Sequence, residues 1–149
     1  NSYMMNLGFK VKICDSPKHV TDTCNLIITT TAATEPILFA DDIQPGTHIT
    51  AMGSDTPAKQ ELDPNIMEKA DCVVADSISQ CIERGEISHA LKDGKLTKNN
   101  IVELGHVLNG QHPGRTAQDQ ITVADLTGVA VQDIQIATAV YESFMENES

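Results

Sequence analysis

The feature that most constrains the fold is a regular alternation of short β-branched runs with stretches of helical character. Such alternation is typical of a parallel sheet whose strands are joined by helical crossovers, so the sequence predicts an α/β fold. The apolar run Leu26-Ile27-Ile28 is continuous rather than alternating, which predicts a central strand covered on both faces. The strands are predicted at residues 11–14, 26–30, 48–51, 72–75 and 121–125.

The segments between these runs carry the start and stop signals of helices. Ser16 and Pro17 form a favourable N-cap and first-turn pair, which predicts a short helix before the second strand. Residues 63–70 repeat this pattern ahead of the fourth strand. Residues 77–91 are predicted to be helical, with an interruption at Gly85 that favours two separate helices.

The clearest helix is predicted over residues 129–145, near the end of the chain. Its apolar side chains recur at helical spacing and form one continuous stripe. These side chains are Ala130, Ile134, Ala137, Val140, Tyr141, Phe144 and Met145. The polar segments 92–100 and 110–120 are predicted to be loops, and residues 1–8 resemble the tail of a helix that Gly8 stops.

The acidic composition restricts the classes of partner. A net charge of -11 and an isoelectric point near 4.6 repel phosphate backbones and anionic membranes, so neither nucleic acid nor a membrane is expected as a partner. Three Phe, two Tyr and no Trp leave an aliphatic core and little stacking surface for bases. With no apolar run of about 18 residues, the chain is predicted to be a single cytoplasmic domain.

The thiol and imidazole groups show no recognisable site in the sequence. Cys14, Cys24, Cys72 and Cys81 form no CxxC pair, which favours reduced, partly buried thiols over a zinc site or a redox pair. The five histidines lack the spacing of metal ligands, so no metal is expected. The absence of a GxSxG elbow leaves a hydrolase nucleophile without support.

The strongest signal for chemistry lies where the predicted strand 48–51 ends. Gly53, Asp55 and Lys59 follow this strand, and the carboxyl ends of strands are where α/β proteins bind their ligands. In a cleft, partial burial would raise the pKa of Asp55 enough for proton exchange with an amine or an imine. An N-cap of a following helix explains Asp55 equally well. Lys59 either contacts a bound anion or cofactor, or is a solvated surface charge.

Two further strand ends carry small and hydroxyl-bearing residues. Thr29, Thr30 and Thr31 follow the apolar strand, and they either line the ribose and phosphates of a nucleotide or form a tight turn. Thr127 and Gly128 follow the last strand, where glycine lets the backbone approach a flat ring and threonine offers a hydroxyl group. An ordinary strand-to-helix turn is the simpler account of the second pair.

Taken together, these blocks resemble the ornithine cyclodeaminase and mu-crystallin family, which also includes alanine dehydrogenases and imine reductases. The resemblance extends from about residue 7 to about residue 144. It rests on residues 28–31, 45–62 and 125–133, with supporting matches at 85–87, 103–105 and 114–115. The family implies a Rossmann domain that holds NAD(H) or NADP(H), paired with a separate domain that contacts the substrate and dimerises.

The resemblance also implies a reaction and a set of site residues. In the cyclodeaminase, hydride leaves the amino-bearing carbon of ornithine for NAD, and the side-chain amine attacks the resulting imine. Ammonia then departs and the hydride returns, giving proline. Asp55 matches the family's acid/base aspartate. The cofactor-binding residues that the resemblance implies are Thr29, Thr30, Thr31, Gly53, Lys59, Leu126, Thr127 and Gly128.

Within the family, two other activities stay open. One is an imine reductase or alanine dehydrogenase with net turnover of NAD(P), and the other is non-catalytic binding of a small ligand, as in the lens protein. Two departures from the family pattern bear on the geometry of the cofactor site. Ala58 stands where glycine is common, and Leu126 stands where some members have serine.

The glycine-rich loop that normally holds a pyrophosphate, GxGxxG, is absent from these 149 residues. The whole chain is therefore expected to be the C-terminal part of a Rossmann domain without its first strand and glycine-rich loop. Such a piece is expected to bind dinucleotide poorly and to be inactive alone. The helix at residues 129–145 is expected to pack on the substrate and dimerisation domain of a homodimeric parent protein.

Overall fold

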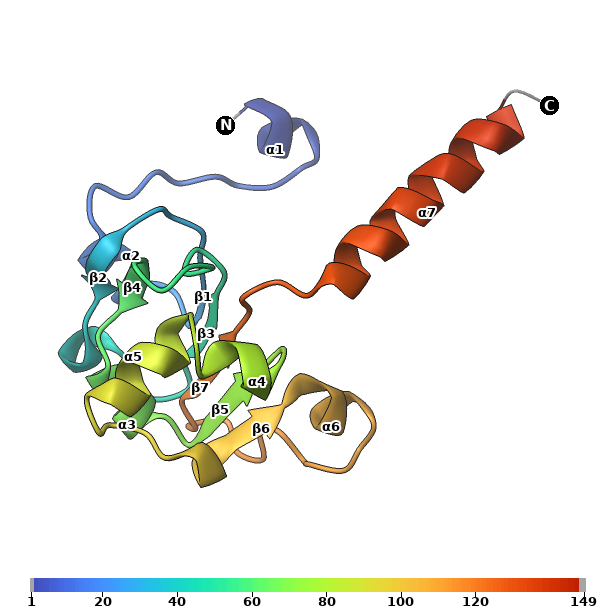
Figure 1. Cartoon of the computed structure of the whole chain (residues 1–149). Helices are drawn as coiled ribbons and strands as arrows, with labels where there is room; N and C mark the ends of the chain where they lie inside the picture. Colours follow the sequence, from blue (N-terminus) through green and yellow to red (C-terminus); the bar gives the residue numbers. More distant parts are fainter. Residues whose placement is uncertain (1, 148–149) are drawn as a thin grey trace.

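The structure, a computed structural model, describes residues 2–147 and is built around a five-stranded parallel sheet (Figure 1). The strands lie in the spatial order β1-β3-β7-β5-β6. Their bounds are Leu26–Thr29 for β1, His48–Ala51 for β3, Thr122–Asp125 for β7, Cys72–Ala75 for β5 and Ile101–Glu103 for β6. A smaller parallel sheet pairs β2, Thr34–Leu38, with β4, Gln60–Leu62. The predicted α/β class with a parallel sheet is confirmed.

Short helices join the strands and agree with the capping signals in the sequence. The Ser16 hydroxyl accepts a hydrogen bond from the His19 N–H at 3.2 Å, as expected of an N-cap. Gly85 separates two helices, α4 and α5, as predicted. The helices are α1 Ser2–Asn6, α2 Pro17–Thr21, α3 Asn65–Lys69, α4 Ile78–Cys81, α5 Glu86–Lys92, α6 Leu104–Leu108 and α7 Ala130–Asn147, and the 3-10 turns are η1 Ala40–Asp42 and η2 Lys98–Asn100.

The register of the sheet brings the carboxyl ends of four strands level with one another. Ala51 at the end of β3 is paired with Thr29 of β1 and with Asp125 of β7, and Asp125 is also paired with Ala75 of β5. The loops that follow these strands therefore meet at one edge of the sheet. The core next to this edge is aliphatic and includes Ile27, Ile43, Ile49, Leu62, Ile66, Val73, Ile87 and Val123.

Two strand predictions are wrong. Residues 11–14 are irregular and form no strand. β1 is an edge strand of the described sheet rather than a central one, because it lies at the end of the strand order. It is also not covered on both faces, since Ile27 is buried while Leu26 and Ile28 are 62% and 59% exposed. A continuous apolar run indicates that both faces favour burial, but it does not say which element covers them. Within residues 2–147, one face of this strand lacks its cover.

Three short strands, β2, β4 and β6, lie outside the predicted set. β2 contains Pro36, which has no backbone N–H and is tolerated only where a strand leaves donors unpaired. β4 contains Glu61, whose charged side chain would normally argue for a surface position. These strands form because of tertiary contacts, which the local pattern does not encode.

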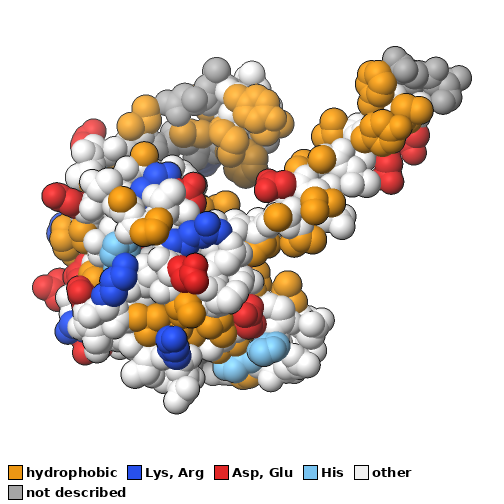
Figure 2. All heavy atoms as spheres, viewed as in Figure 1, with side chains coloured by type: hydrophobic (Ala, Val, Ile, Leu, Met, Phe, Trp, Pro, Cys, Tyr) orange, Lys and Arg blue, Asp and Glu red, His pale blue; other side chains and the backbone are white. Residues whose placement is uncertain are grey.

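Both ends of the described chain extend away from the sheet (Figure 1). Figure 2 shows apolar side chains gathered on α1 and along α7. They include Tyr3, Met4, Met5, Ile134, Ile136, Val140, Tyr141 and Phe144, all of them exposed. No helix within residues 2–147 has the length and hydropathy needed to cross a membrane. All four cysteines are free thiols; Cys72 and Cys81 are buried, and Cys24 is exposed.

Candidate functional site

A cavity at the carboxyl ends of β3 and β7 brings several predicted site residues together. The loop after β3 contributes Asp55, and the turn after β7 contributes three residues that precede α7. The cavity has a volume of about 180 Å³ and is lined by Met52, Asp55, Leu126, Thr127, Gly128 and Gln132. Four of the nine residues predicted to form the site therefore surround one cavity.

Asp55 lies at this cavity as an ion pair with Lys59. The Asp55 Oδ1 accepts a hydrogen bond from the Lys59 Nζ at 2.7 Å, and the Asp55 side chain is 52% exposed. This hydrogen bond lowers the pKa of Asp55. The prediction that burial raises the pKa of Asp55 is therefore wrong for this structure, because the carboxylate is exposed and paired with a cation. The N-cap interpretation is also wrong, since the next element is the strand β4 rather than a helix.

The turn after β7 is held by Asp76, which follows β5. The Asp76 Oδ2 accepts the Gly128 N–H at 2.8 Å, and its Oδ1 accepts the Thr127 hydroxyl at 3.3 Å. Gly128 has a φ of +83°, a left-handed conformation that glycine adopts without strain. The Leu126 N–H donates to the Ala51 carbonyl at 2.9 Å. These bonds fix the turn beside the end of β3, so the cavity has one rigid wall.

Thr29, Thr30 and Thr31 line a different cavity, between β1, α2 and β2, with a volume of about 360 Å³. The Thr29 hydroxyl is buried and has no hydrogen-bond partner among the described residues. A buried hydroxyl without a partner costs free energy, typically about 1–3 kcal/mol, unless a ligand or water satisfies it. This atom is therefore an unsatisfied polar group at the carboxyl edge of the sheet.

Gly53 lies between the two cavities and lines neither. It is buried, and its N–H donates to the Glu61 Oε2 at 2.9 Å. A Cβ atom at this position would lie 2.2 Å from the Thr31 carbonyl oxygen and 2.5 Å from the Glu61 carboxylate. Close packing thus requires glycine at position 53, and its contact with a cofactor stays a prediction.

Three buried carboxylates, which the sequence patterns did not single out, lie directly behind the site. Glu61, Glu86 and Asp125 are 0%, 1% and 1% exposed. The Glu86 oxygens accept the N–H groups of Glu61 at 2.7 Å and of Leu62 at 3.0 Å. The Asp125 Oδ2 accepts the Ile87 N–H at 2.8 Å, whereas its Oδ1 has no partner among the described residues.

Burial determines the protonation of two of these groups. It raises the pKa of Glu86 to about 7 and the pKa of Asp125 to about 7, against backbone hydrogen bonds that act in the opposite direction. The proximity of Glu86 and Asp125 raises the pKa of Asp125 further. All three carboxylates lie in segments that carry the family resemblance, at 45–62, 85–87 and 125–133, but an acidic residue in a sequence is usually solvated, so their burial was not predicted.

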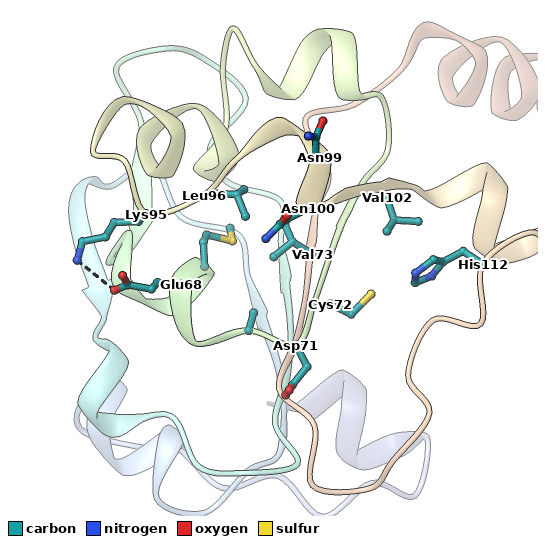
Figure 3. Close-up of a pocket in the computed structure, with 12 residues that line it drawn as sticks. Glu68, Asp71, Cys72, Val73, Lys95, Leu96, Asn99, Asn100, Val102 and His112 are labelled. Carbon is teal, nitrogen blue, oxygen red and sulfur yellow. Dashed lines mark hydrogen bonds and ion pairs between the residues drawn. The ribbon is translucent and has the colours of Figure 1, made fainter.

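A separate cavity of about 270 Å³ lies at the opposite, amino-terminal edge of the sheet (Figure 3). Cys72 and Val73 at the start of β5 line it, together with Asn100, which directly precedes β6. Lys95 and Glu68 form an ion pair of 3.0 Å at its rim. None of the predicted site residues lines this cavity. Among the described residues, no cluster of three or more His, Cys, Asp or Glu could hold a metal ion.

Comparison with known proteins places this geometry in a family. Residues 1–148 match the sequence profile of the ornithine cyclodeaminase/mu-crystallin family. An uncharacterized cyclodeaminase of Sinorhizobium fredii is 41% identical over 143 residues, covering 95% of this chain and 43% of the relative. The alanine dehydrogenase of Archaeoglobus fulgidus is 36% identical over 143 residues, covering 95% of this chain and 44% of the relative.

The fold is also similar to that of solved structures. The iminosuccinate reductase of Paracoccus denitrificans, in complex with NAD+, superimposes with a TM-score of 0.90 at 32% identity, over 99% of this chain and 45% of that structure. The chain thus spans less than half the length of these relatives. Because residues 1–148 match the family's sequence profile, the chain belongs to the ornithine cyclodeaminase/mu-crystallin family.

Proposed function

We propose that this chain is part of an NAD(P)-dependent cyclodeaminase that acts on ornithine or a related amino acid. The observation that carries the proposal is the convergence of Asp55 with Leu126, Thr127 and Gly128 around one cavity at the carboxyl ends of adjacent strands. Family membership supports the proposed reaction at this cavity, because relatives are named as a cyclodeaminase, an alanine dehydrogenase and an iminosuccinate reductase.

In this proposal Asp55 exchanges protons with the nitrogen of the substrate. The ion pair with Lys59 keeps the Asp55 carboxylate ionised near neutral pH, so its first role is that of a base that accepts a proton from an amine. Asp55 accepts and holds that proton more readily once Lys59 is drawn away, because the pKa of Asp55 then rises. Lys59 is proposed to leave its partner by turning toward the anionic groups of the dinucleotide.

The remaining site residues are proposed to hold the dinucleotide, NAD or NADP, which supplies a hydride acceptor when bound. The unsatisfied Thr29 hydroxyl and the cavity along Thr29, Thr30 and Thr31 fit a polyhydroxylated group such as ribose. Gly128 leaves open space beside Thr127, where a flat ring could approach the backbone. Gly53 is proposed to hold Thr31 in place at the ribose cavity, because it packs closely against the Thr31 carbonyl.

A reductase or dehydrogenase that consumes or produces reduced dinucleotide is the second candidate. The names of the alanine dehydrogenase and iminosuccinate reductase relatives favour it. A cyclodeaminase returns its hydride, so the absorbance of reduced dinucleotide separates the two candidates. Net change in absorbance supports the second, and ammonia release without net change supports the first.

We also propose that residues 1–149 are the C-terminal part of a dinucleotide-binding domain and that α7 packs on a substrate and dimerisation domain. The apolar side chains gathered along α7 support this (Figure 2). Val140, Tyr141 and Phe144 are 63%, 64% and 56% exposed. They line an open apolar surface, and exposed apolar patches of this kind mark interaction sites.

The test of the catalytic proposal uses the protein expressed from its complete reading frame. Ornithine, alanine and a cyclic imine are supplied with NAD or NADP, and ammonia and reduced dinucleotide are measured. Asp55→Asn is expected to lower turnover roughly 100-fold or more, because the amide cannot exchange the proton. Asp119→Asn, an exposed acid outside the site, serves as the matched control and is expected to keep the wild-type rate. Wild-type turnover by the Asp55→Asn protein would refute the role of Asp55.

A further inference from the structure

Glu61 joins the two strand-end loops that carry the proposed site. Its Oε1 accepts the Thr31 N–H at 2.5 Å, and its Oε2 accepts the Gly53 N–H at 2.9 Å. Thr31 follows β1 and Gly53 follows β3, so one side chain spans the ends of two adjacent strands. Glu61 is completely buried, and it lies outside the two cavities that the proposed site residues line.

The packing around this carboxylate leaves no room for the loops to shift. Gly53 lies so close to the Thr31 carbonyl and to Glu61 that even one added carbon atom would overlap both. Asp55 is only two residues farther along the chain, and its own N–H donates to the Gly53 carbonyl at 3.1 Å. Any displacement of Gly53 is therefore passed directly to the backbone of Asp55.

Glu61 is itself held in place from behind. The N–H groups of Glu61 and Leu62 both donate to the carboxylate of Glu86, at 2.7 Å and 3.0 Å. Glu86 is the first residue of α5 and is buried, so the backbone that carries Glu61 is fixed against a helix of the core. The carboxylate of Glu61 thus has a rigid base and holds the two strand-end loops at its tip.

We propose that Glu61 is a positioning residue that sets the location of Asp55 by bonding the Thr31 and Gly53 amides. The proposal rests on the proposed function only in that Asp55 is taken as the proton-exchanging group. A carboxylate suits this task because both of its oxygens accept hydrogen bonds, and bonds to an ionised acceptor are short and directional. An amide in its place has one acceptor and one donor, so one of the two loops must lose its bond.

The test compares Glu61→Gln with Asp63→Asn in the protein expressed from its complete reading frame. Asp63 is a matched control because its two oxygens also accept backbone N–H groups, from Ala40 at 3.4 Å and Asn65 at 3.0 Å, but it touches neither loop. Hydrogen exchange of the amides at Thr31 and Gly53 is measured together with kcat and KM. Glu61→Asp, which keeps the charge but cannot reach both amides, is the second variant should Glu61→Gln fail to fold.

The expected result is faster exchange at Thr31 and Gly53 in both Glu61 variants, with kcat lowered roughly 10- to 100-fold and a smaller change in KM. Asp63→Asn is expected to keep wild-type exchange in the loops and wild-type kcat. Unchanged exchange and kcat in a folded Glu61 variant would overturn the proposal, as would faster exchange with an unchanged kcat. Wild-type protein without NAD(P)-dependent turnover would contradict the proposed function instead, and amide exchange alone would then decide whether Glu61 positions the loops.

Discussion

The strand-end loops and the terminal helix α7 differ in how far their side chains are buried. Around Gly53, Glu61 and Asp125 the packing is close, and the two carboxylates are buried and accept backbone N–H groups. Along α7, most of the large apolar side chains are more than half exposed. The first region is closely packed by its own chain, whereas the second has an exposed apolar surface typical of an interaction site.

This difference shows that an apolar pattern predicts which side chains favour burial, but not whether a surface that covers them is present. The stripe of α7 and the apolar run of β1 both predict side chains that are suited to burial. Burial then depends on whether a partner surface lies within the same 149 residues, and for Leu26, Ile28 and Phe144 none covers the side chain in the described structure. The following changes test the contrast between the two regions.

The largest effect is expected from Gly53→Ala in the packed region. The added Cβ would overlap the Thr31 carbonyl at 2.2 Å, and backbone cannot move aside as a flexible side chain can. The free energy of unfolding is expected to fall by about 3 kcal/mol or more, measured by chemical denaturation. Gly105→Ala in α6 is the control, since no described atom lies within 4 Å of its added Cβ, and it is expected to be neutral or slightly stabilising. Equal effects of the two changes would show that the strand-end packing is looser than described.

The next largest effect is a pH dependence from Asp125. Its pKa is raised to about 7 by burial, so the folded state holds the proton more tightly than the unfolded state. The stabilisation is complete below the ordinary pKa of an aspartate and is lost as the pH rises through about 7. The Asp125→Asn side chain cannot ionise, and its amide oxygen can take the place of the carboxylate oxygen that accepts the Ile87 N–H. This substitution is expected to raise the free energy of unfolding by about 2 kcal/mol near pH 8 and to change it little near pH 5, in denaturation curves at both pH values.

Glu86, whose pKa is also raised to about 7, contributes to stability with the same sign. Asp125→Asn is therefore expected to reduce the pH dependence of stability rather than abolish it. A variant with the full wild-type slope between pH 5 and pH 8 would mean that Asp125 is ionised and solvated in the folded protein.

A small effect is expected from Phe144→Ser on the stripe of α7. Phe144 is 56% exposed, so the change is expected to alter the free energy of unfolding of this 149-residue chain by less than about 0.5 kcal/mol. In the protein from the complete reading frame, a loss above about 1 kcal/mol is expected if α7 is covered there. Leu108→Ser in α6, where Leu108 is 77% exposed, is the control and is expected to be neutral in both proteins. Equal, negligible effects of Phe144→Ser in both would refute the packing of α7.

The smallest effect on stability is expected from Lys59→Met. The lysine lowers the pKa of Asp55 through their hydrogen bond, so its removal is expected to raise that pKa toward its ordinary value in an NMR titration. The stability that the pair contributes is present above the ordinary pKa of Asp55 and is lost as the pH falls through the lowered value. Because both side chains reach solvent, this contribution is screened. Lys95→Met, which breaks the Glu68 ion pair, should leave the pKa of Asp55 unchanged.

The sequence predicted the central elements of the fold because each is encoded locally. β3 and β5 begin and end at the predicted residues, and Ser16 and Gly85 mark the helix boundaries that the structure contains. β2 and β4 were not predictable in this way, since Pro36 and Glu61 both argue against a strand on local grounds. They pair only because the chain folds them against each other.

The site was predictable to the extent that strand ends in a parallel sheet converge. This rule correctly brought Asp55 into the neighbourhood of Leu126, Thr127 and Gly128. The rule does not predict solvent exposure, so the predicted direction of the pKa shift of Asp55 was wrong. It also gave no reason to expect Glu86 and Asp125 in the interior, because burial of an acid depends on distant backbone N–H groups that only the folded chain supplies.

The buried thiol of Cys81 and the exposed thiol of Cys24 together make local opening of this protein measurable. Cys81 donates a weak hydrogen bond to the Asp76 carboxylate, and burial raises the pKa of its thiol to about 12, so its reactive thiolate is scarcely populated near neutral pH. An alkylating reagent should modify the exposed Cys24 at once, and Cys81 only in molecules whose sheet has separated from α4. The rate of Cys81 alkylation relative to that of Cys24 therefore measures how often this part of the protein opens. Mass spectrometry of the chain without any substitution follows both reactions.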